Sequence, residues 1–287
     1  VKYQRDILKN VEGYVPGEQP KMANIIKLNT NENPYPPSPK AVEALLAVGA
    51  DSIRRYPDPL ATELRRLCAE RYGYENETWV FAGNGVDECL ANAMRAFVDP
   101  GDTVITPYPT YVLYETLAQL HGATCKYIDL DNDFQLTEQF FTTPARMCFL
   151  PRPNSPSGVV CPKETVERLC REFNGLVVID EAYIDFGEDD CMDLPKRFDN
   201  AMVMRTFSKS FSLAGMRLGI TVARPEIINE FMKVKDSYNL DAVTQAVGTA
   251  SIQDYDWMLA NAQKVKATRA RLVTALEQMG FKVPPSQ

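Results

Sequence analysis

The chain has 287 residues, of which 45% are hydrophobic and 24% charged, as is ordinary for a globular protein of one large or two modest domains. The net charge of -7, without a basic run, argues against nucleic acid as the main partner. No apolar run approaches the length of a membrane span, and the N-terminus lacks a signal-peptide pattern.

Cysteine and histidine usage narrows the chemistry. The seven cysteines are scattered without a CxxC pair, so we expect free thiols in a reducing cytoplasm. His121 is the only histidine, which excludes a metal site built from several histidines, and we predict no metal. It lies in Leu120-His121-Gly122, which predicts a helix C-terminus and favours a structural role. Proton transfer is therefore expected from lysine, tyrosine or a carboxylate.

The first 46 residues are rich in proline and asparagine and predict an extended arm that leads into a helix near Pro39. From there on, short apolar runs alternate with helical patterns, which predicts a parallel sheet of βαβ type. The predicted strands are 78–81, 103–106, 146–150, 176–179 and 201–204, and the predicted helices between them are 86–97, 111–120 and 163–173. After Arg224-Pro225 the pattern is mostly helical, with a long helix expected from about 255 to 279.

The last residues, Phe281-Lys282-Val283, have the apolar pattern of a strand, and the sequence stops at Gln287. A strand without a partner is an unstable ending, so we expect that part of a second domain is missing from this sequence. We divide the chain into an arm with part of a small domain (1–46), a large domain (47–250) and the start of a small C-terminal domain (251–287).

Lys209 lies between Ser208 and Ser210, with Arg217 eight residues on. A lysine amine can form a Schiff base with the aldehyde of pyridoxal 5'-phosphate (PLP), and Ser208 and Arg217 can hold its phosphate. Alternatively, the lysine is a solvated surface charge and Arg217 a surface ion-pair partner. The choice depends on whether the rest of a cofactor site is present.

Asp180 ends the buried strand 176–179, where a carboxylate is costly unless it is paired. A protonated pyridine nitrogen is a suitable partner, because the charge pair keeps the ring able to accept electrons from a substrate carbanion. Tyr183 is close enough in sequence to reach the phenolic oxygen of the ring. The alternative is that Asp180 caps the next segment.

Three more polar segments follow predicted strands, where open parallel sheets bind ligands. The segment 83–88 is a glycine turn that opens a helix, which suits a phosphate or is a plain tight turn. The tyrosines of the segment 107–111, with Tyr114 a turn later, could stack on a planar cofactor or pack in the core. Asn154, between prolines, could donate to a ring oxygen, or its segment is only a turn.

With these segments taken together, the sequence from about 26 to 287 resembles the fold-type I PLP-dependent aminotransferases, most closely the histidinol-phosphate aminotransferases. Seven stretches carry the resemblance, in order and at family-like spacing: 28–34, 55–58, 83–88, 107–111, 153–158, 178–183 and 206–219. The resemblance implies an α/β fold, with a mostly parallel central sheet flanked by helices and a second, smaller α/β domain that is C-terminally truncated here.

The resemblance also implies catalytic roles for three residues. Lys209 would be the Schiff-base lysine and the acid and base that moves a proton between the substrate Cα and the cofactor C4'. Asp180 would pair with the pyridine nitrogen, and Tyr183 would hydrogen-bond the ring oxygen. The implied cofactor-binding set is Tyr56, the amides of Val86 and Asp87, Tyr111, Asn154, Asp180, Tyr183, Thr206, Ser208, Lys209 and Arg217.

Tyr56 would reach the phosphate of the neighbouring subunit's cofactor, which implies a homodimer. Many members of the family have asparagine directly before the proline of the 153–158 motif, where this chain has Ser155. We expect Asn154, one position earlier, to supply the amide.

The activity that the resemblance implies is amino transfer from L-histidinol phosphate to 2-oxoglutarate, giving imidazole acetol phosphate and L-glutamate. The alternatives are an aromatic amino acid aminotransferase, a decarboxylase of an amino acid phosphate, and a non-catalytic PLP-fold module used for binding or regulation. The presence of Lys209, Asp180, Tyr183 and Arg217 argues against the last. The family's substrate-binding arginines would lie beyond Gln287.

Overall fold

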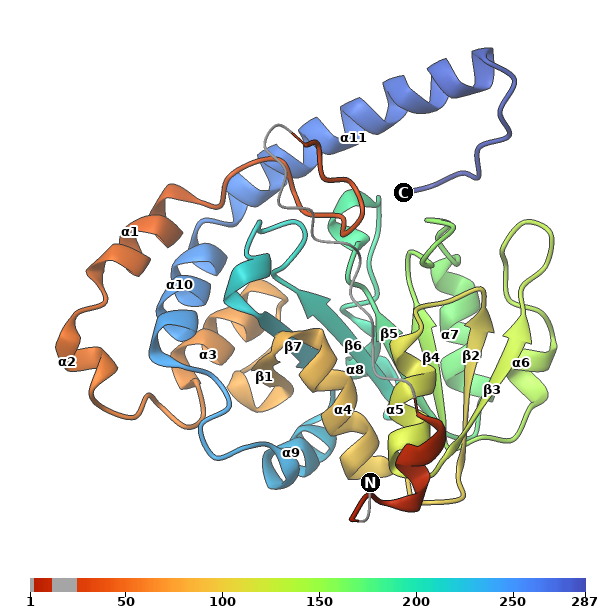
Figure 1. The fold of residues 1–287 in the computed structure, drawn as a ribbon, viewed down its shortest axis with the longest axis horizontal. Helices are drawn as coiled ribbons and strands as arrows, with labels where there is room; N and C mark the ends of the chain where they lie inside the picture. The colour runs from red at the N-terminus through yellow and green to blue at the C-terminus, as the bar shows by residue number, and fades with distance from the viewer. Residues whose placement is uncertain (1–2, 12–24) are drawn as a thin grey trace.

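A seven-stranded sheet forms the centre of the structure, a computed structural model that describes residues 3–11 and 25–287 (Figure 1). Its strands are β1 (Val80–Asn84), β2 (Thr103–Tyr108), β3 (Thr124–Asp129), β4 (Met147–Pro151), β5 (Leu176–Asp180), β6 (Ala201–Thr206) and β7 (Leu218–Val222). They lie in the order β1-β7-β6-β5-β4-β2-β3. Within the described chain β7 runs in the opposite direction to the other six strands, which are parallel to one another, so the predicted mostly parallel sheet is confirmed.

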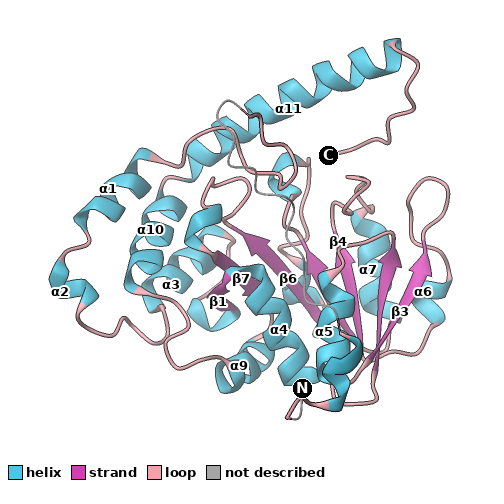
Figure 2. Cartoon of the chain, in the orientation of Figure 1, coloured by secondary structure: helices cyan, strands magenta, loops and turns pink. Residues whose placement is uncertain are grey.

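Helices cover both faces of this sheet (Figure 2). They are α1 (Pro39–Ala47), α2 (Ala50–Ile53), α3 (Thr62–Arg71), α4 (Gly85–Phe97), α5 (Leu113–His121), α6 (Gln139–Thr142), α7 (Lys163–Glu172), α8 (Leu194–Arg197), α9 (Pro225–Val234), α10 (Ala242–Gln253) and α11 (Tyr255–Gln278). Four short 3-10 segments join them: η1 (Asp6–Asn10), η2 (Glu77–Trp79), η3 (Ile184–Phe186) and η4 (Ala214–Met216). None of the helices in the described ranges is both long and apolar enough to cross a bilayer.

Each central strand contributes to two separate hydrophobic cores, because successive side chains point to opposite faces of a sheet. Val178 packs in the core that contains Leu90 of α4 and Leu117 of α5. Its neighbours Val177 and Ile179 pack in the core on the other face, which includes residues of α7 and α10. The fold is therefore three layers, and the alternation decides which face each strand-end residue reaches.

The predicted strands and helices are confirmed with small changes of boundary, and the predicted helix 255–279 is α11. Two strands, β3 and β7, were not predicted. The strand expected at 281–283 is wrong: these residues have no regular structure, and Phe281 is 58% exposed. An apolar run becomes a strand only beside a partner, and the pairing nearest to this segment in the described chain is one isolated bridge, between Val159 and Ser286.

The predicted N-terminal arm is described only in part, because residues 1–2 and 12–24 lie outside the described residues. Residues 25–38 contain neither helix nor strand, and α1 begins at Pro39 as expected. Ser38 caps this helix, since its hydroxyl accepts a 3.1 Å hydrogen bond from the Lys40 amide. The same hydroxyl donates to Asp254, just before α11. The arm is thus fixed at its C-terminal end beside α11.

Candidate active site

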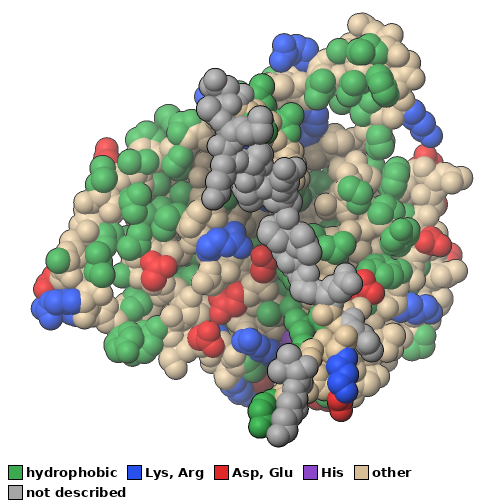
Figure 3. Space-filling model, viewed as in Figure 1, with side chains coloured by type: hydrophobic (Ala, Val, Ile, Leu, Met, Phe, Trp, Pro, Cys, Tyr) green, Lys and Arg blue, Asp and Glu red, His purple; other side chains and the backbone are tan. Residues whose placement is uncertain are grey.

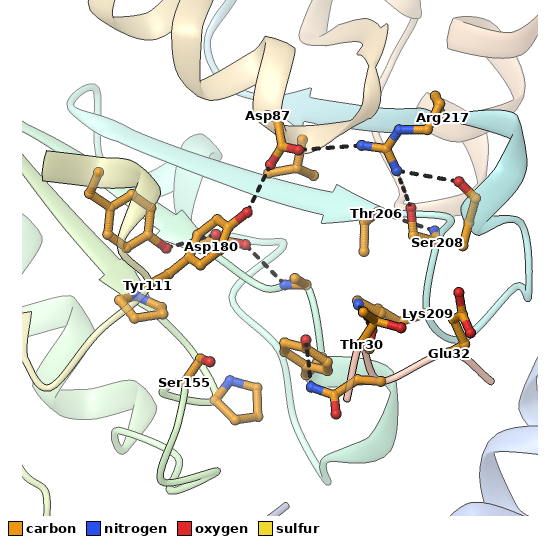
Figure 4. A pocket seen from close by; sticks show the side chains of 18 of the residues that line it. Thr30, Glu32, Asp87, Tyr111, Ser155, Asp180, Thr206, Ser208, Lys209 and Arg217 are labelled. Carbon is orange, nitrogen blue, oxygen red and sulfur yellow. Dashed lines mark hydrogen bonds and ion pairs between the residues drawn. The ribbon is translucent and has the colours of Figure 1, made fainter. Parts of the chain in front are cut away.

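A cavity of about 410 Å³ lies at the carboxyl ends of the parallel strands (Figure 4). The last residues of β4, β5 and β6, which are Pro151, Asp180 and Thr206, all line it. The other lining residues are Asn29, Thr30, Asn31, Glu32, Val86, Asp87, Tyr111, Tyr114, Pro153, Ser155, Ala182, Tyr183, Ser208, Lys209, Ala214 and Arg217. Nine of the eleven predicted site residues therefore meet in one cavity: all except Tyr56 and Asn154.

Lys209 lies on the loop after β6, and its side chain points into the cavity (Figure 4). The Nζ atom donates a 3.0 Å hydrogen bond to the carbonyl of Thr30 and lies 5.3 Å from the centre of the Tyr183 ring. Asn31 donates a 3.1 Å hydrogen bond to the Tyr183 hydroxyl. The arm therefore forms one wall of the site. Sequence reasoning did not assign these arm residues to the site, although stretch 28–34 was among the seven that carry the family resemblance.

Asp180 is buried at the end of β5, on the α4 and α5 face of the sheet. Its carboxylate accepts a 2.7 Å hydrogen bond from the Tyr114 hydroxyl and a 3.2 Å bond from the Ala182 amide. Burial raises the pKa of Asp180 to about 6, and the two hydrogen bonds oppose this effect. Asp180 forms no ion pair with any residue that the structure describes, so its ionised form lacks a cation.

The opposite end of the cavity is formed by the start of α4 and by Arg217. Arg217 donates 3.3 Å hydrogen bonds to the Ser208 hydroxyl and to the Asp87 carboxylate (Figure 4). A Cβ atom at Gly85, whose φ is +78°, would lie 2.7 Å from the Arg217 guanidinium, so the contact needs glycine. The free amides of a helix N-terminus beside an arginine are a suitable site for a phosphate.

Aromatic side chains form another wall. Tyr114 stacks on Phe149 with ring centres 4.9 Å apart, and Tyr111 meets Tyr114 edge to face at 5.7 Å. The Tyr111 hydroxyl lies 3.5 Å from the Asp87 carboxylate. Because Tyr114 fixes the orientation of Tyr111, a planar ring could be held against Tyr111. Tyr114 itself is a site residue that the sequence prediction left out, although its position one turn after the 107–111 motif was a signal.

Two predicted residues lie outside this cavity. Asn154 lines a neighbouring cavity of about 300 Å³, and its amide donates a 2.9 Å hydrogen bond to Ser157. Its buried carbonyl oxygen has no partner within the described chain. Ser155 lines both cavities. Tyr56 is 80% exposed and stacks on Tyr238, with ring centres 4.4 Å apart. The roles of Asn154 and Tyr56 stay predictions.

These residues fit PLP in three independent respects. Lys209 offers an amine inside the cavity, the raised pKa of Asp180 reflects a buried carboxylate that a ring cation would pair with, and the start of α4 with Arg217 offers an anion site. A lysine, a buried carboxylate and a phosphate cradle at the strand ends of a mostly parallel sheet define a PLP-dependent enzyme of fold type I.

The chain belongs to the aminotransferase class I and II family, whose model matches residues 23–287. It is 43% identical to a histidinol-phosphate aminotransferase of Rhodopirellula baltica, over 98% of this chain and 78% of that protein. It is 45% identical to a histidinol-phosphate aminotransferase of Synechocystis sp., over 98% of this chain and 80% of that protein. The crystal structure of the histidinol-phosphate aminotransferase from Sinorhizobium meliloti, in complex with PLP, shares the fold with a TM-score of 0.82 at 24% identity, over 90% of this chain and 72% of that one.

Proposed function

We propose that this protein transfers the amino group of L-histidinol phosphate to 2-oxoglutarate with PLP as cofactor, giving imidazole acetol phosphate and L-glutamate. The observation that carries the proposal is the convergence of Lys209, Asp180, Tyr183 and Arg217 on one cavity. The substrate is taken from the names of relatives at 43–45% identity.

PLP, when bound, supplies an electron sink that stabilises negative charge on the substrate Cα. The Asp180 carboxylate would hold a proton on the ring nitrogen, which the sink requires. Tyr114 keeps that carboxylate oriented, because its hydrogen bond fixes one of the two oxygens. Burial of Asp180 strengthens the charge pair, since few water dipoles screen it.

Lys209 would move the proton between the substrate Cα and C4' of the cofactor. Its Nζ lies inside the cavity, and the Thr30 carbonyl, an uncharged acceptor at 3.0 Å, holds it there. An amine that is positioned but not ion-paired is suited to give and take protons. Tyr183, whose hydroxyl already accepts from Asn31, would donate to the ring oxygen together with Asn154.

The phosphate would be held by Arg217, Ser208 and the amides of Val86 and Asp87 at the start of α4. The Arg217 and Asp87 side chains are 47% and 52% exposed, so a phosphate could replace Asp87 as the arginine's partner at low cost. The Thr206 hydroxyl accepts a 3.1 Å hydrogen bond from the Ser208 amide and so shapes the same loop. Tyr111 would stack on the ring.

We also propose that the active unit is a homodimer in which Tyr56 reaches the partner's cofactor phosphate. Large apolar side chains are exposed along α1 and α2, including Val42, Leu45, Leu46 and Ile53. Hydrophobic side chains gather on this side of the molecule, at the left of Figure 3. A contiguous exposed apolar patch is typical of a protein interface.

Two further proposals concern organisation and location. Residues 47–250 would be the large cofactor-binding domain, and residues 1–46 and 251–287 would belong to the small one. The contact of Ser38 with Asp254 supports grouping these two parts. We propose a cytoplasmic location, which the seven free cysteines support.

The test is to load the whole protein with PLP and add L-histidinol phosphate, with L-phenylalanine as the matched comparison. Histidinol phosphate should change the visible absorbance of the bound cofactor rapidly, and 2-oxoglutarate should restore it. Rapid change with phenylalanine alone would favour the aromatic aminotransferase, and release of carbon dioxide would favour the decarboxylase. Lys209→Ala should lose the absorbance change, and borohydride should no longer fix PLP to the protein.

A further inference from the structure

A buried network of charged side chains lies behind the site, on the opposite face of the sheet. Three strands end in residues that line the cavity, and in each strand the residue adjacent to that last one points to the opposite face. Arg152 follows β4, Glu181 follows β5, and Arg205 is the penultimate residue of β6. All three are almost fully buried. Arg205 donates to Glu181 at 3.0 Å, and Arg152 donates to Glu181 at 3.3 Å. One carboxylate therefore ties three site strands together.

Arg205 extends this network toward the site. Its Nη1 donates a 2.6 Å hydrogen bond to Asp185, and its Nη2 donates a 3.0 Å bond to Asp190. Burial lowers the pKa of Arg205, but the carboxylates of Asp185 and Glu181 outweigh it and raise the pKa well above its usual value. Arg205 therefore stays charged and holds both aspartates.

Asp185 has a second partner in the loop that carries Lys209. Its Oδ2 accepts a 2.5 Å hydrogen bond from the hydroxyl of Ser210, the residue directly after Lys209. Ser210 is 2% exposed, and the Asp185 side chain is 9% exposed, so water competes little for this bond. Asp185 lies in η3, two residues after Tyr183. One carboxylate thus joins the segment of Tyr183 to the segment of Lys209.

The Lys209 turn is fixed from its other side by the arm. The side-chain Nδ2 of Asn33 donates to the backbone carbonyls of Lys209 and Ser210, at 3.0 and 3.2 Å. The backbone of the turn is thereby held on one side and the Ser210 side chain on the other. A residue held on both sides cannot rotate its peptide planes freely, which fixes the starting point of the Lys209 side chain.

We propose that Asp185 is a positioning residue for Lys209: clamped by Arg205, it holds Ser210 and so sets the placement of the lysine amine relative to Tyr183. The proposal rests on the proposed use of Lys209 with PLP. It assigns the buried network a role in the site beyond joining the strands, because without Asp185 the network would not reach the lysine loop.

The primary test is Ser210→Ala, which removes only the hydroxyl, in the whole protein. We expect the dissociation constant for PLP to rise by roughly fivefold to tenfold, the loss of one charge-assisted hydrogen bond. The pH at which the visible absorbance of bound PLP changes should also shift, which a loss of fold stability alone would not cause. Ser210→Thr, which keeps the hydroxyl, should restore both values. Asp190→Asn is the matched control, since Asp190 bonds the same Arg205 but lies 46% exposed and does not touch Ser210.

A double-mutant cycle separates positioning from general damage. Asp185→Ala and Ser210→Ala should not be additive, because each removes the same bond. In the protein without PLP, Ser210→Ala should change the rate at which an acylating reagent labels Lys209 by several-fold, measured by mass spectrometry of its peptide. This labelling readout does not depend on PLP binding. A wild-type protein that fails to bind PLP would therefore contradict the proposed function, and the labelling rates would still decide the positioning role. Wild-type PLP affinity, absorbance and labelling in Ser210→Ala would overturn the positioning role alone.

Discussion

The Tyr114 hydroxyl donates a 2.7 Å hydrogen bond to the carboxylate of Asp180, 66 residues further along the chain. Both residues are buried. Burial and the nearby Asp180 charge raise the pKa of Tyr114 well above its usual value, so the phenol keeps its proton and remains a donor. The Ala182 amide takes the other oxygen. The carboxylate is thus fixed in one orientation before any ligand arrives.

Tyr114→Phe tests this orientation, because phenylalanine keeps the stack on Phe149 and removes only the hydroxyl. The hydrogen bond lowers the pKa of Asp180, so its loss should raise that pKa above about 6. We expect PLP affinity at neutral pH to fall by roughly tenfold, the value of one hydrogen bond to a charged group. Tyr111→Phe is the control, because the Tyr111 hydroxyl donates to Asp87 at 3.5 Å and phenylalanine keeps the ring that would stack on PLP. Equal PLP affinities for wild type and Tyr114→Phe would contradict the role of this bond.

Asp180→Asn should separate stability from function. Burial raises the folded-state pKa of Asp180 from 3.8 to about 6, so the neutral form is favoured on folding. The protonated carboxyl therefore contributes roughly 3 kcal/mol to the free energy of unfolding. This contribution is complete below about pH 4 and is lost as pH rises through about 6. Asparagine does not titrate, so the PLP-free variant should not show this loss between about pH 4 and pH 7. Urea unfolding across this range measures it, and parallel curves for the two proteins would refute it.

Bound PLP should reverse this effect, so that the ionised form of Asp180 stabilises the protein. The protonated ring nitrogen of PLP would supply a cation for the ionised Asp180, so PLP should stabilise the wild type more than Asp180→Asn at about pH 8. Turnover of the variant should fall by at least about a hundredfold, because it lacks the charge that keeps the ring protonated. A variant with wild-type turnover would show that Asp180 does not pair with the ring.

The strands that end in site residues could be predicted because they are buried on both faces and read as continuous apolar runs. β3 was missed because it is a partly exposed edge strand. It contains few apolar residues, and polar ones such as Lys126 interrupt the apolar pattern. β7 was missed because it has only five residues, includes Gly219, and directly follows Arg217, so its short apolar pattern was assigned to the Arg217 motif. Both depend on neighbours that a local pattern does not contain.

The contacts of the N-terminal arm with the site also could not be predicted from local sequence patterns. Thr30 and Lys209 are 179 residues apart, and their bond uses a backbone carbonyl, which any residue could supply. The Asp185–Ser210 bond is likewise invisible in sequence, since serine and aspartate are common on loops. By contrast, Lys209, Asp180 and Arg217, which line one cavity, could be selected from the sequence, because they stand in motifs that follow strands in the order and at the spacing of the family.

Gly219→Ala should damage the phosphate end of the site. A Cβ atom at Gly219 would lie 2.5 Å from the Val86 amide nitrogen, which is backbone and cannot move aside cheaply. We expect a loss of about 1–3 kcal/mol of stability, with weaker PLP binding, because the start of α4 must shift. Gly215→Ala is the matched control: a Cβ atom there has nothing within 4 Å, so stability should change by less than about 0.5 kcal/mol. Equal melting temperatures for the two variants would contradict the close packing of β7 on α4.

Tyr56→Phe tests the proposed contact across a dimer. Phenylalanine keeps the stacking on Tyr238 but removes the hydroxyl that would reach the partner's phosphate. PLP affinity should fall by roughly tenfold while the oligomeric state is unchanged. Tyr238→Phe, the matched control, keeps the same stack and should bind PLP normally. A Tyr56→Phe variant with normal PLP affinity would remove Tyr56 from the site.

Mixing two defective proteins makes the same test stricter. In a mixed dimer of Tyr56→Phe and Lys209→Ala, one site would combine an intact Lys209 with an intact Tyr56 donated by the partner, because a two-fold interface exchanges the same contact both ways. With random exchange half of the dimers are mixed and each has one complete site, so about a quarter of all sites should regain full PLP affinity and turnover. We expect PLP affinity and turnover to recover in proportion to the fraction of mixed dimers, which chromatography of tagged subunits measures. Mixed dimers without recovery would place each site within a single subunit.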